Sequence, residues 1–231
     1  MGLSEGAVLT GLGVGLISAV GEVHVIKPVA ALPEWAKDSL PSEQKKVALR
    51  EAIEAVAKHL DELGEKAGGT SAEIFDALKM FLEDDELIEM ANEAIDEGWS
   101  GAAAYGKAAD TFGELIGGDP TFAERVADLQ DLSKRVQAQL AGIEMSLELP
   151  ETGSIVLVGE DFSPADTAQF TSAVVGVITI KGGPTSHTAI ICRSLSIPAV
   201  VSCTGAAALA SGDLVLVDPV GDRVVLSGDS S

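Results

Sequence analysis

Three kinds of residue are scarce in this sequence: aromatic residues, cations and cysteines. Phe, Trp and Tyr make up 4% of the 231 residues, so the core must be built from aliphatic side chains, and nothing indicates stacking on nucleic-acid bases. Lys and Arg number 15 against 36 acidic residues, a formal charge of −21, which would repel a phosphate polymer. The negative charge would attract a basic protein but would also serve solubility, and charge alone does not decide between the two.

Cysteine spacing and hydrophobic runs exclude further classes of protein. Cys192 and Cys203 form neither a metal-ligand spacing nor a disulfide framework, so a cytoplasmic protein with reduced thiols is expected. Residues 7–26 are largely apolar, but glycines, Glu22 and His24 interrupt them and no basic segment precedes them. Neither a signal peptide nor a membrane span is therefore expected. A hydrophobic share of 46% with 22% charged residues is typical of a globular protein.

The pattern along the chain begins with a β-rich segment and continues with a helical block. Residues 7–26 alternate glycines with small and β-branched residues, which predicts short strands and tight turns. From Ser42 to about Ala141, apolar residues recur at helical spacing, and capping residues and glycines divide the block into four parts. The predicted helices cover residues 43–66, 70–98 with a kink or restart at 83–86, 101–116 and 120–141. Short turns between them predict a bundle of antiparallel neighbours.

The second half of the chain alternates between strand and helix patterns. Strands are predicted at residues 155–158, 174–180, 199–201, 214–217 and 223–226, with short helices within 161–169 and 188–195. Because the helical block lies between two β-rich pieces, the simplest architecture is an α/β domain with a helical domain inserted into it. The predicted parts are residues 1–32 and 147–231 for the α/β domain and 33–146 for the helical domain.

Residues 182–190, Gly-Gly-Pro-Thr-Ser-His-Thr-Ala-Ile, give the strongest indication of chemistry. They place His187 at a predicted helix start, after glycines that permit a sharp turn and leave room for a bulky group. Thr185 and Ser186 supply hydroxyls, and a helix start offers free N–H groups and a positive dipole end. Neutral imidazole is nucleophilic at physiological pH. A phosphorylated histidine fits this pattern, although a histidine after a glycine-rich turn is also commonly a capping or loop residue.

This stretch resembles the phosphohistidine domain of the phosphoenolpyruvate-utilising enzymes, whose motif is Gly-Gly-x-Thr-Ser-His-x-Ala-Ile followed by an arginine. The similarity continues through residues 194–201, and residues 161–167 match the family's Asp-x-Ser/Thr-Pro-x-x-Thr turn. The resemblance implies that His187 is the phosphorylated residue and that Thr167 helps to orient its imidazole. It also implies a phosphate environment made of Gly182, Gly183, Thr185, Ser186, Thr188 and Arg193. Pro184 stands where arginine is common, so no phosphate contact is carried over to it.

The helical block discriminates among the family members, which include pyruvate phosphate dikinase, phosphoenolpyruvate synthase and Enzyme I of the sugar phosphotransferase system. Enzyme I is the member with a helical domain threaded into its phosphohistidine domain, and residues 75–87 and 123–135 are similar to two of its helices. Lys181 and Gln130 depart from the family pattern. The resemblance implies that the helical domain binds the histidine-containing phosphocarrier protein HPr. The implied partner-binding residues are Ile74, Leu78, Phe81, Asp85, Glu86 and Leu87.

Members of the family bind phosphoenolpyruvate and Mg²⁺ in a barrel that lies beyond the residues matched here. We therefore expect this chain to hold no cofactor or metal of its own, to be a monomer, and to exchange phosphoryl groups with HPr but not directly with phosphoenolpyruvate. Two other interpretations stay open: a swivelling domain of a dikinase-type enzyme, and a non-catalytic helical interaction module. Phosphoryl transfer to a partner would separate all three.

Overall fold

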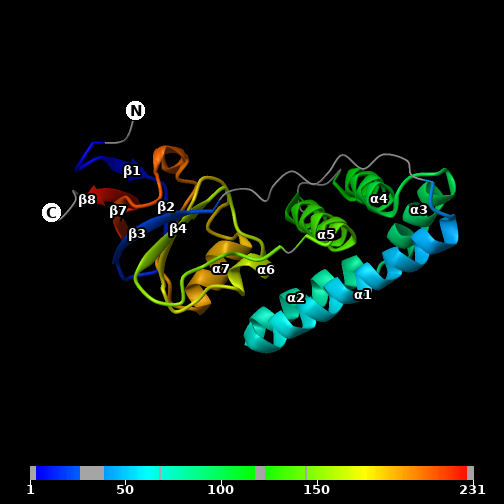
Figure 1. Cartoon of the computed structure of the whole chain (residues 1–231). Helices are drawn as coiled ribbons and strands as arrows, with labels where there is room; N and C mark the ends of the chain where they lie inside the picture. Colours follow the sequence, from blue (N-terminus) through cyan, green and yellow to red (C-terminus); the bar gives the residue numbers. More distant parts are fainter. Residues whose placement is uncertain (1–3, 27–38, 68, 118–122, 144, 228–231) are drawn as a thin grey trace. The chain divides into compact units, whose positions relative to one another are not determined.

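The computed structural model describes residues 4–26, 39–67, 69–117, 123–143 and 145–227. They fall into two compact units, one from residues 1–28 and 147–231 and the other from residues 29–146. The first contains a sheet with short helices and the second consists of helices (Figure 1). A mixed sheet together with a set of helices agrees with the predicted fold class. The predicted boundary between residues 32 and 33 lies outside the described residues.

Eight strands form a single mixed sheet in the order β1-β8-β7-β3-β4-β5-β6-β2. Their bounds are β1 Val8–Thr10, β2 Leu12–Val14, β3 Ala19–Val25, β4 Ile155–Gly159, β5 Val174–Thr179, β6 Ala199–Val201, β7 Leu214–Asp218 and β8 Arg223–Ser227. β3, β4, β5 and β6 pair in parallel, and the other pairs are antiparallel. Every residue of β4 is buried, as expected for a parallel strand covered on both faces.

The two edge strands of this sheet are consecutive in the chain. Only Gly11 separates β1 at one edge from β2 at the other, and one residue spans less than about 4 Å. The sheet must therefore curl until its edges meet. Gly11 confirms this, because its N–H donates to the Asp222 carbonyl at 3.0 Å while a Cβ on it would lie 2.6 Å from Val200. The sequence predicted short strands here but not that they close a sheet.

Parallel strands β4 and β5 position the candidate site. The chain leaves β4 into α6 (Pro164–Thr167) and leaves β5 into α7 (His187–Ser194). Because the carboxyl ends of adjacent parallel strands share one edge of a sheet, both loops emerge side by side. α6 and α7 contact each other, and one core cluster of the sheet includes Phe162 near α6 with Ala189 and Cys192 of α7. A second cluster includes Ala206 of the short 3-10 helix η2 (Thr204–Ala208).

Five helices form the described part of the helical unit. They are α1 Ser42–Ala67, α2 Gly69–Leu82, α3 Asp85–Asp96, α4 Gly101–Ile116 and α5 Ala123–Ala141. α1 packs against α2 and α5, and α4 packs against α3 and α5. Fully buried side chains at helical spacing build the core, among them Leu49, Leu60, Tyr105, Leu129 and Leu132. Among the described residues no helix combines the length and apolar character needed to cross a bilayer.

The break between α2 and α3 is a restart rather than a kink. Asp84 has an extended backbone, and its carboxylate accepts hydrogen bonds from the N–H groups of Glu86 and Leu87 at 3.0 and 3.2 Å. An N-cap of this kind satisfies the first free N–H groups of a new helix. The region predicted as one interrupted helix is therefore two helices, and the predicted four-part block has five. Asp119, which directly precedes the predicted helix at 120–141 and suits an N-cap, lies outside the described residues.

Candidate active site

His187 is the first residue of α7. Ser186 caps this helix, because its hydroxyl accepts a hydrogen bond from the N–H of Ala189 at 3.4 Å. The imidazole is partly exposed, but its Nδ1 atom is buried. The exposed part of the side chain therefore lies away from Nδ1. A partly exposed imidazole at a helix start matches the position that the sequence predicted for the nucleophile.

Residues 181–186, which we call the glycine loop, connect β5 to α7. Gly182 has a φ of +83°, and a Cβ on it would lie 2.9 Å from Asp161 Oδ2, so glycine is required on both conformational and steric grounds. Gly183 differs, because a Cβ there would meet no atom within 4 Å. Arg193 Nη1 donates to the Pro184 carbonyl at 2.7 Å. The guanidinium that sequence reasoning placed near phosphate thus contacts the glycine loop.

The Thr188 hydroxyl forms hydrogen bonds with other residues of the same unit. The side chain is fully buried, and its Oγ1 lies 2.7 Å from Asp161 Oδ1 and 3.0 Å from the Phe162 carbonyl. Asp161 Oδ1 also accepts from the N–H of Phe162 at 2.9 Å. The start of α7 is therefore tied directly to the loop that follows β4.

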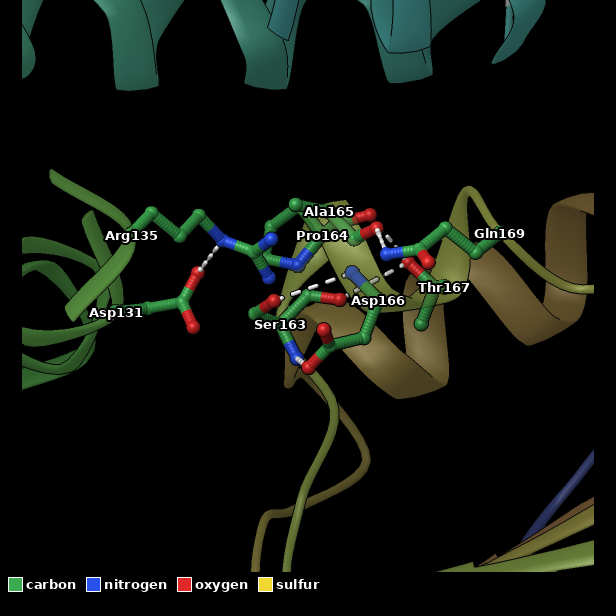
Figure 2. Close-up of polar contacts among 8 residues, drawn as sticks. All are labelled: Asp131, Arg135, Ser163, Pro164, Ala165, Asp166, Thr167 and Gln169. Carbon is green, nitrogen blue, oxygen red and sulfur yellow. Dashed lines mark hydrogen bonds and ion pairs between the residues drawn. The ribbon is translucent and has the colours of Figure 1, made fainter. Parts of the chain in front are cut away.

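Thr167 ends α6, whose first turn is held by a reciprocal capping box. The Ser163 hydroxyl accepts from the Asp166 N–H, and the Asp166 carboxylate accepts from the Ser163 N–H (Figure 2). Thr167 is 1% exposed, and its hydroxyl lies 2.8 Å from the Pro164 carbonyl, to which it donates. The hydroxyl proton therefore points at the main chain of α6, and only the oxygen lone pairs remain for another group.

Burial determines the reactivity of Cys192, which lies on the same helix as His187. Cys192 of α7 is fully buried, and this burial raises the pKa of its thiol to about 12. The thiolate, which is the reactive form, is scarce at neutral pH. Cys192 is thus a packing residue. Within the described residues, no group of three or more His, Cys, Asp or Glu side chains could hold a metal ion.

The six residues predicted to bind a partner divide by burial. Leu78 and Leu87 are 4% and 0% exposed and lie in the core of the helical unit. Ile74 and Phe81 are partly exposed, and Asp85 and Glu86 are exposed. All six belong to α2 and the first turn of α3. The structure thus leaves four of them available at the surface and places two beneath it.

Sequence reasoning missed a contact of Phe81 and a groove in the helical unit. Arg125 of α5 lies over the Phe81 ring, 5.9 Å from its centroid, within the range of a cation–π contact. A groove between α4 and α5 is lined by Ala109, Asp110, Gly113, Glu114, Gly117, Val126 and Gln130. The recurrence of small residues at positions 106, 109, 113 and 117 was its sequence signal. Further along α5, Arg135 is 5% exposed and its Nε donates to Asp131 at 2.7 Å (Figure 2).

Comparison with protein families assigns both units. Residues 10–125 match the N-terminal domain of phosphoenolpyruvate-utilising enzymes, and residues 151–221 match their mobile domain. The chain is 36% identical over 213 residues to the phosphoenolpyruvate-protein phosphotransferase of Streptomyces coelicolor, covering 91% of this chain and 38% of that protein. It is 35% identical to the corresponding protein of Staphylococcus carnosus, over 78% of this chain and 32% of that protein. The chain thus spans less than half the length of these relatives.

Two solved structures share the fold. A solution structure of an Enzyme I protein superimposes with a TM-score of 0.71 at 30% identity, covering 96% of this chain and 94% of the other. The N-terminal domain of a nitrogen-type Enzyme 1 superimposes with a TM-score of 0.62 at 21% identity, covering 95% and 93%. At 21% identity, the similarity to the nitrogen-type protein shows the fold alone. The similarity to the Enzyme I solution structure extends over both units of the chain.

Proposed function

Because the chain belongs to the phosphoenolpyruvate-utilising enzymes and matches the N-terminal part of their phosphoenolpyruvate-protein phosphotransferases, we propose that it carries a phosphoryl group on His187 and transfers it to HPr. The observation that carries the proposal is a partly exposed imidazole at the capped start of α7, behind a glycine loop. Similarity to Enzyme I over both units favours this function over a dikinase-type role.

The burial of Nδ1 supports Nε2 as the nucleophilic nitrogen. With Nδ1 enclosed and the imidazole partly exposed, we take Nε2 as the nitrogen that accepts the phosphoryl group. In the accepting step a bond forms between Nε2 and phosphorus while the bond from phosphorus to the donor nitrogen breaks, and the reverse step returns the group. In the neutral tautomer that carries its proton on Nδ1, an imidazole can accept the group at Nε2 without losing a proton. Positioning and charge stabilisation then supply most of the catalysis.

The residues around His187 divide into those that would meet phosphate and those that support the site. Gly183 and Thr185 of the glycine loop can offer N–H donors to the equatorial oxygens, and Thr185 and Ser186 can offer hydroxyls. Gly182 provides the turn beside Asp161, and Thr188, with its hydroxyl committed within the fold, supports the start of α7. Arg193 holds the loop through Pro184 and contributes positive charge. We assign Thr167, at the end of α6 that packs on α7, to orienting the imidazole.

The docking surface for HPr comprises Ile74, Phe81, Asp85, Glu86 and Arg125, with the groove between α4 and α5 continuing it. Phe81 and Ile74 offer apolar contacts, and the carboxylates of α3 offer a rim for a basic partner. The helical unit, residues 29–146, contains 25 of the 36 acidic residues and 11 of the 15 basic ones. Such an excess would steer a basic protein toward this unit. Leu78 and Leu87 support the surface from below.

The source of the phosphoryl group lies outside these residues. We propose that phosphoenolpyruvate and Mg²⁺ bind in a further domain of the kind that completes the longer relatives, and that this chain performs the exchange with HPr in the cytoplasm. No cofactor is assigned to the residues described here. The chain by itself would be a monomeric phosphoryl carrier.

Incubation with phosphorylated HPr tests the proposal. We expect one acid-labile phosphate on the chain, mapped by mass spectrometry to the peptide that contains His187. The His187→Ala variant should take up none, whereas His24→Ala and His59→Ala, which change the other two histidines, should remain competent. Uptake by His187→Ala, or failure of the unaltered chain to accept phosphate, would contradict the proposal.

A further inference from the structure

Asp161 holds the glycine loop from one side. Its Oδ1 accepts hydrogen bonds from the Thr188 hydroxyl at 2.7 Å and the Phe162 N–H at 2.9 Å. Its Oδ2 lies against Gly182, where a Cβ would approach it to 2.9 Å. One carboxylate therefore bonds to the residue directly after His187 and lies close beside the turn before it. Charge-assisted bonds of this length are among the stronger ones in proteins.

Ser202 holds the same loop from the other side. It follows β6, and its hydroxyl donates a hydrogen bond to the Gly182 carbonyl. Its backbone has a φ of +54°, a conformation that non-glycine residues rarely adopt. The neighbouring main chain is also tied to the end of β5, because the Cys203 N–H donates to the Thr179 carbonyl at 2.8 Å. Strained conformations of this kind persist where the surroundings fix them, and they gather at functional sites.

We propose that Asp161 and Ser202 are positioning residues that clamp Gly182 from two sides and so fix the orientation of the His187 imidazole for phosphoryl transfer. The inference rests on the proposed function for its kinetic consequence. Neither residue needs to touch the phosphoryl group. Both act through the glycine loop, Asp161 through Thr188 and Gly182, and Ser202 through the Gly182 carbonyl.

The clamp explains how a loop with few buried residues can keep the His187 imidazole in a fixed position. Lys181, Gly182, Pro184 and Thr185 are exposed, so burial contributes little to their order. A displacement of about 1 Å in the reacting group can slow a reaction by about two orders of magnitude. Polar anchors on both sides of Gly182 would prevent such a displacement while leaving Gly183 open to phosphate.

Four variants of the full chain test the proposal. Asp161→Ala removes the anchor, while Asp161→Asn keeps an oxygen that can accept from Thr188 and the Phe162 N–H. Ser202→Ala removes the bond to Gly182. Asp213→Ala is the matched control, because Asp213 accepts from the Ala210 N–H in another turn of the same unit. The readouts are the single-turnover rate of phosphoryl acceptance from phosphorylated HPr and the nitrogen–proton correlation spectrum of the unphosphorylated His187 ring, with His24 and His59 as internal references.

We expect Asp161→Ala and Ser202→Ala to lower the rate by about tenfold or more, to change the tautomer or line shape of His187, and to leave His24 and His59 unchanged. Asp161→Asn should restore most of the rate, and Asp213→Ala should match the unaltered chain. If both effects act through one loop, the double variant should lose less than the product of the two single losses.

Three outcomes would overturn the clamp: wild-type rates and His187 signals in both alanine variants, a loss in Asp161→Asn as large as in Asp161→Ala, or an equal loss in Asp213→Ala. If Asp161→Ala does not fold, Ser202→Ala and Asp161→Asn decide the matter. Failure of the unaltered chain to accept phosphate would instead remove the proposed function. In that case the ring spectra would still show whether Asp161 and Ser202 orient His187.

Discussion

Truncation of Phe81 and of Leu87 should separate partner binding from stability on one helical surface. Leu87 is 0% exposed and sits in the core at the start of α3, so Leu87→Ala should lower the free energy of unfolding by about 2–5 kcal/mol. Phe81 is partly exposed, and its identified partner is the Arg125 guanidinium at 5.9 Å. A cation–π contact at such a site contributes about 0.5–1 kcal/mol, so Phe81→Ala should cost the fold about 1 kcal/mol.

For binding of HPr we expect the opposite ranking of the two variants, with the larger loss in Phe81→Ala. An apolar anchor at the centre of an interface costs about 2 kcal/mol or more on truncation, so Phe81→Ala should raise the dissociation constant by more than about tenfold. Glu86→Gln, which removes only a rim charge, should raise it by less than about fivefold. Calorimetric titration measures the binding, and urea unfolding of the same samples measures the stability. A folded Phe81→Ala variant with unchanged affinity, or a Leu87→Ala variant that loses affinity at full stability, would refute this assignment.

Three further predictions concern the sheet, the thiol and the phosphoryl source. Gly13→Ala should lower the free energy of unfolding by about 3 kcal/mol in urea titrations, because its Cβ would lie 1.8 Å from the Pro219 carbonyl oxygen; Gly183→Ala, with open space, should change it little. Cys192 should resist iodoacetamide at pH 8 until the chain unfolds, since burial raises its pKa to about 12. Because the pKa of Cys192 is raised in the folded state, its contribution to the free energy of unfolding is complete below about pH 9 and declines as the pH rises toward 12. Mass analysis measures the alkylation, and urea unfolding at several pH values measures the stability. Label from phosphoenolpyruvate with Mg²⁺ should not reach the chain without another enzyme, and direct uptake would contradict the proposed division of labour.

Local signals in the sequence were sufficient to predict most of the helices and strands. Ser100 directly precedes the predicted helix at 101–116 as a capping residue, and its hydroxyl accepts the expected bond from the N–H of Ala103. The uninterrupted apolar run at 155–158 correctly indicated a strand, and every residue of β4 is buried. These features depend on residues close together in the chain, which is why pattern alone could predict them. A kink or a restart was predicted at residues 83–86, but a helix cap and a helix kink interrupt the apolar pattern in the same way, so the sequence could not distinguish them.

Properties that depend on distant residues were not predictable in this way. The closure of the sheet requires β1 and β2 to pair with β8 and β6, which lie about 200 residues further on. Leu78 and Leu87 share the helical spacing of surface neighbours, and only packing against the other helices shows that they are buried. The Thr188 hydroxyl similarly lay beside His187 in the sequence, yet its partner Asp161 is 27 residues away. Motif proximity therefore predicted a candidate site but not the partner of each hydroxyl within it.

The distribution of chemistry between the two units follows from what each fold can provide. A helix start beside the ends of parallel strands supplies fixed N–H groups, and the contacts of Asp161, Ser202 and Arg193 hold the loop before it. Helix surfaces instead supply exposed side chains at regular spacing, which suits recognition of another protein. Phosphorylation adds roughly 1.5 to 2 negative charges to its carrier. Transfer to HPr would move that charge onto a partner held by an acidic surface, so the attraction that brings HPr to the helical unit would weaken once the transfer is complete.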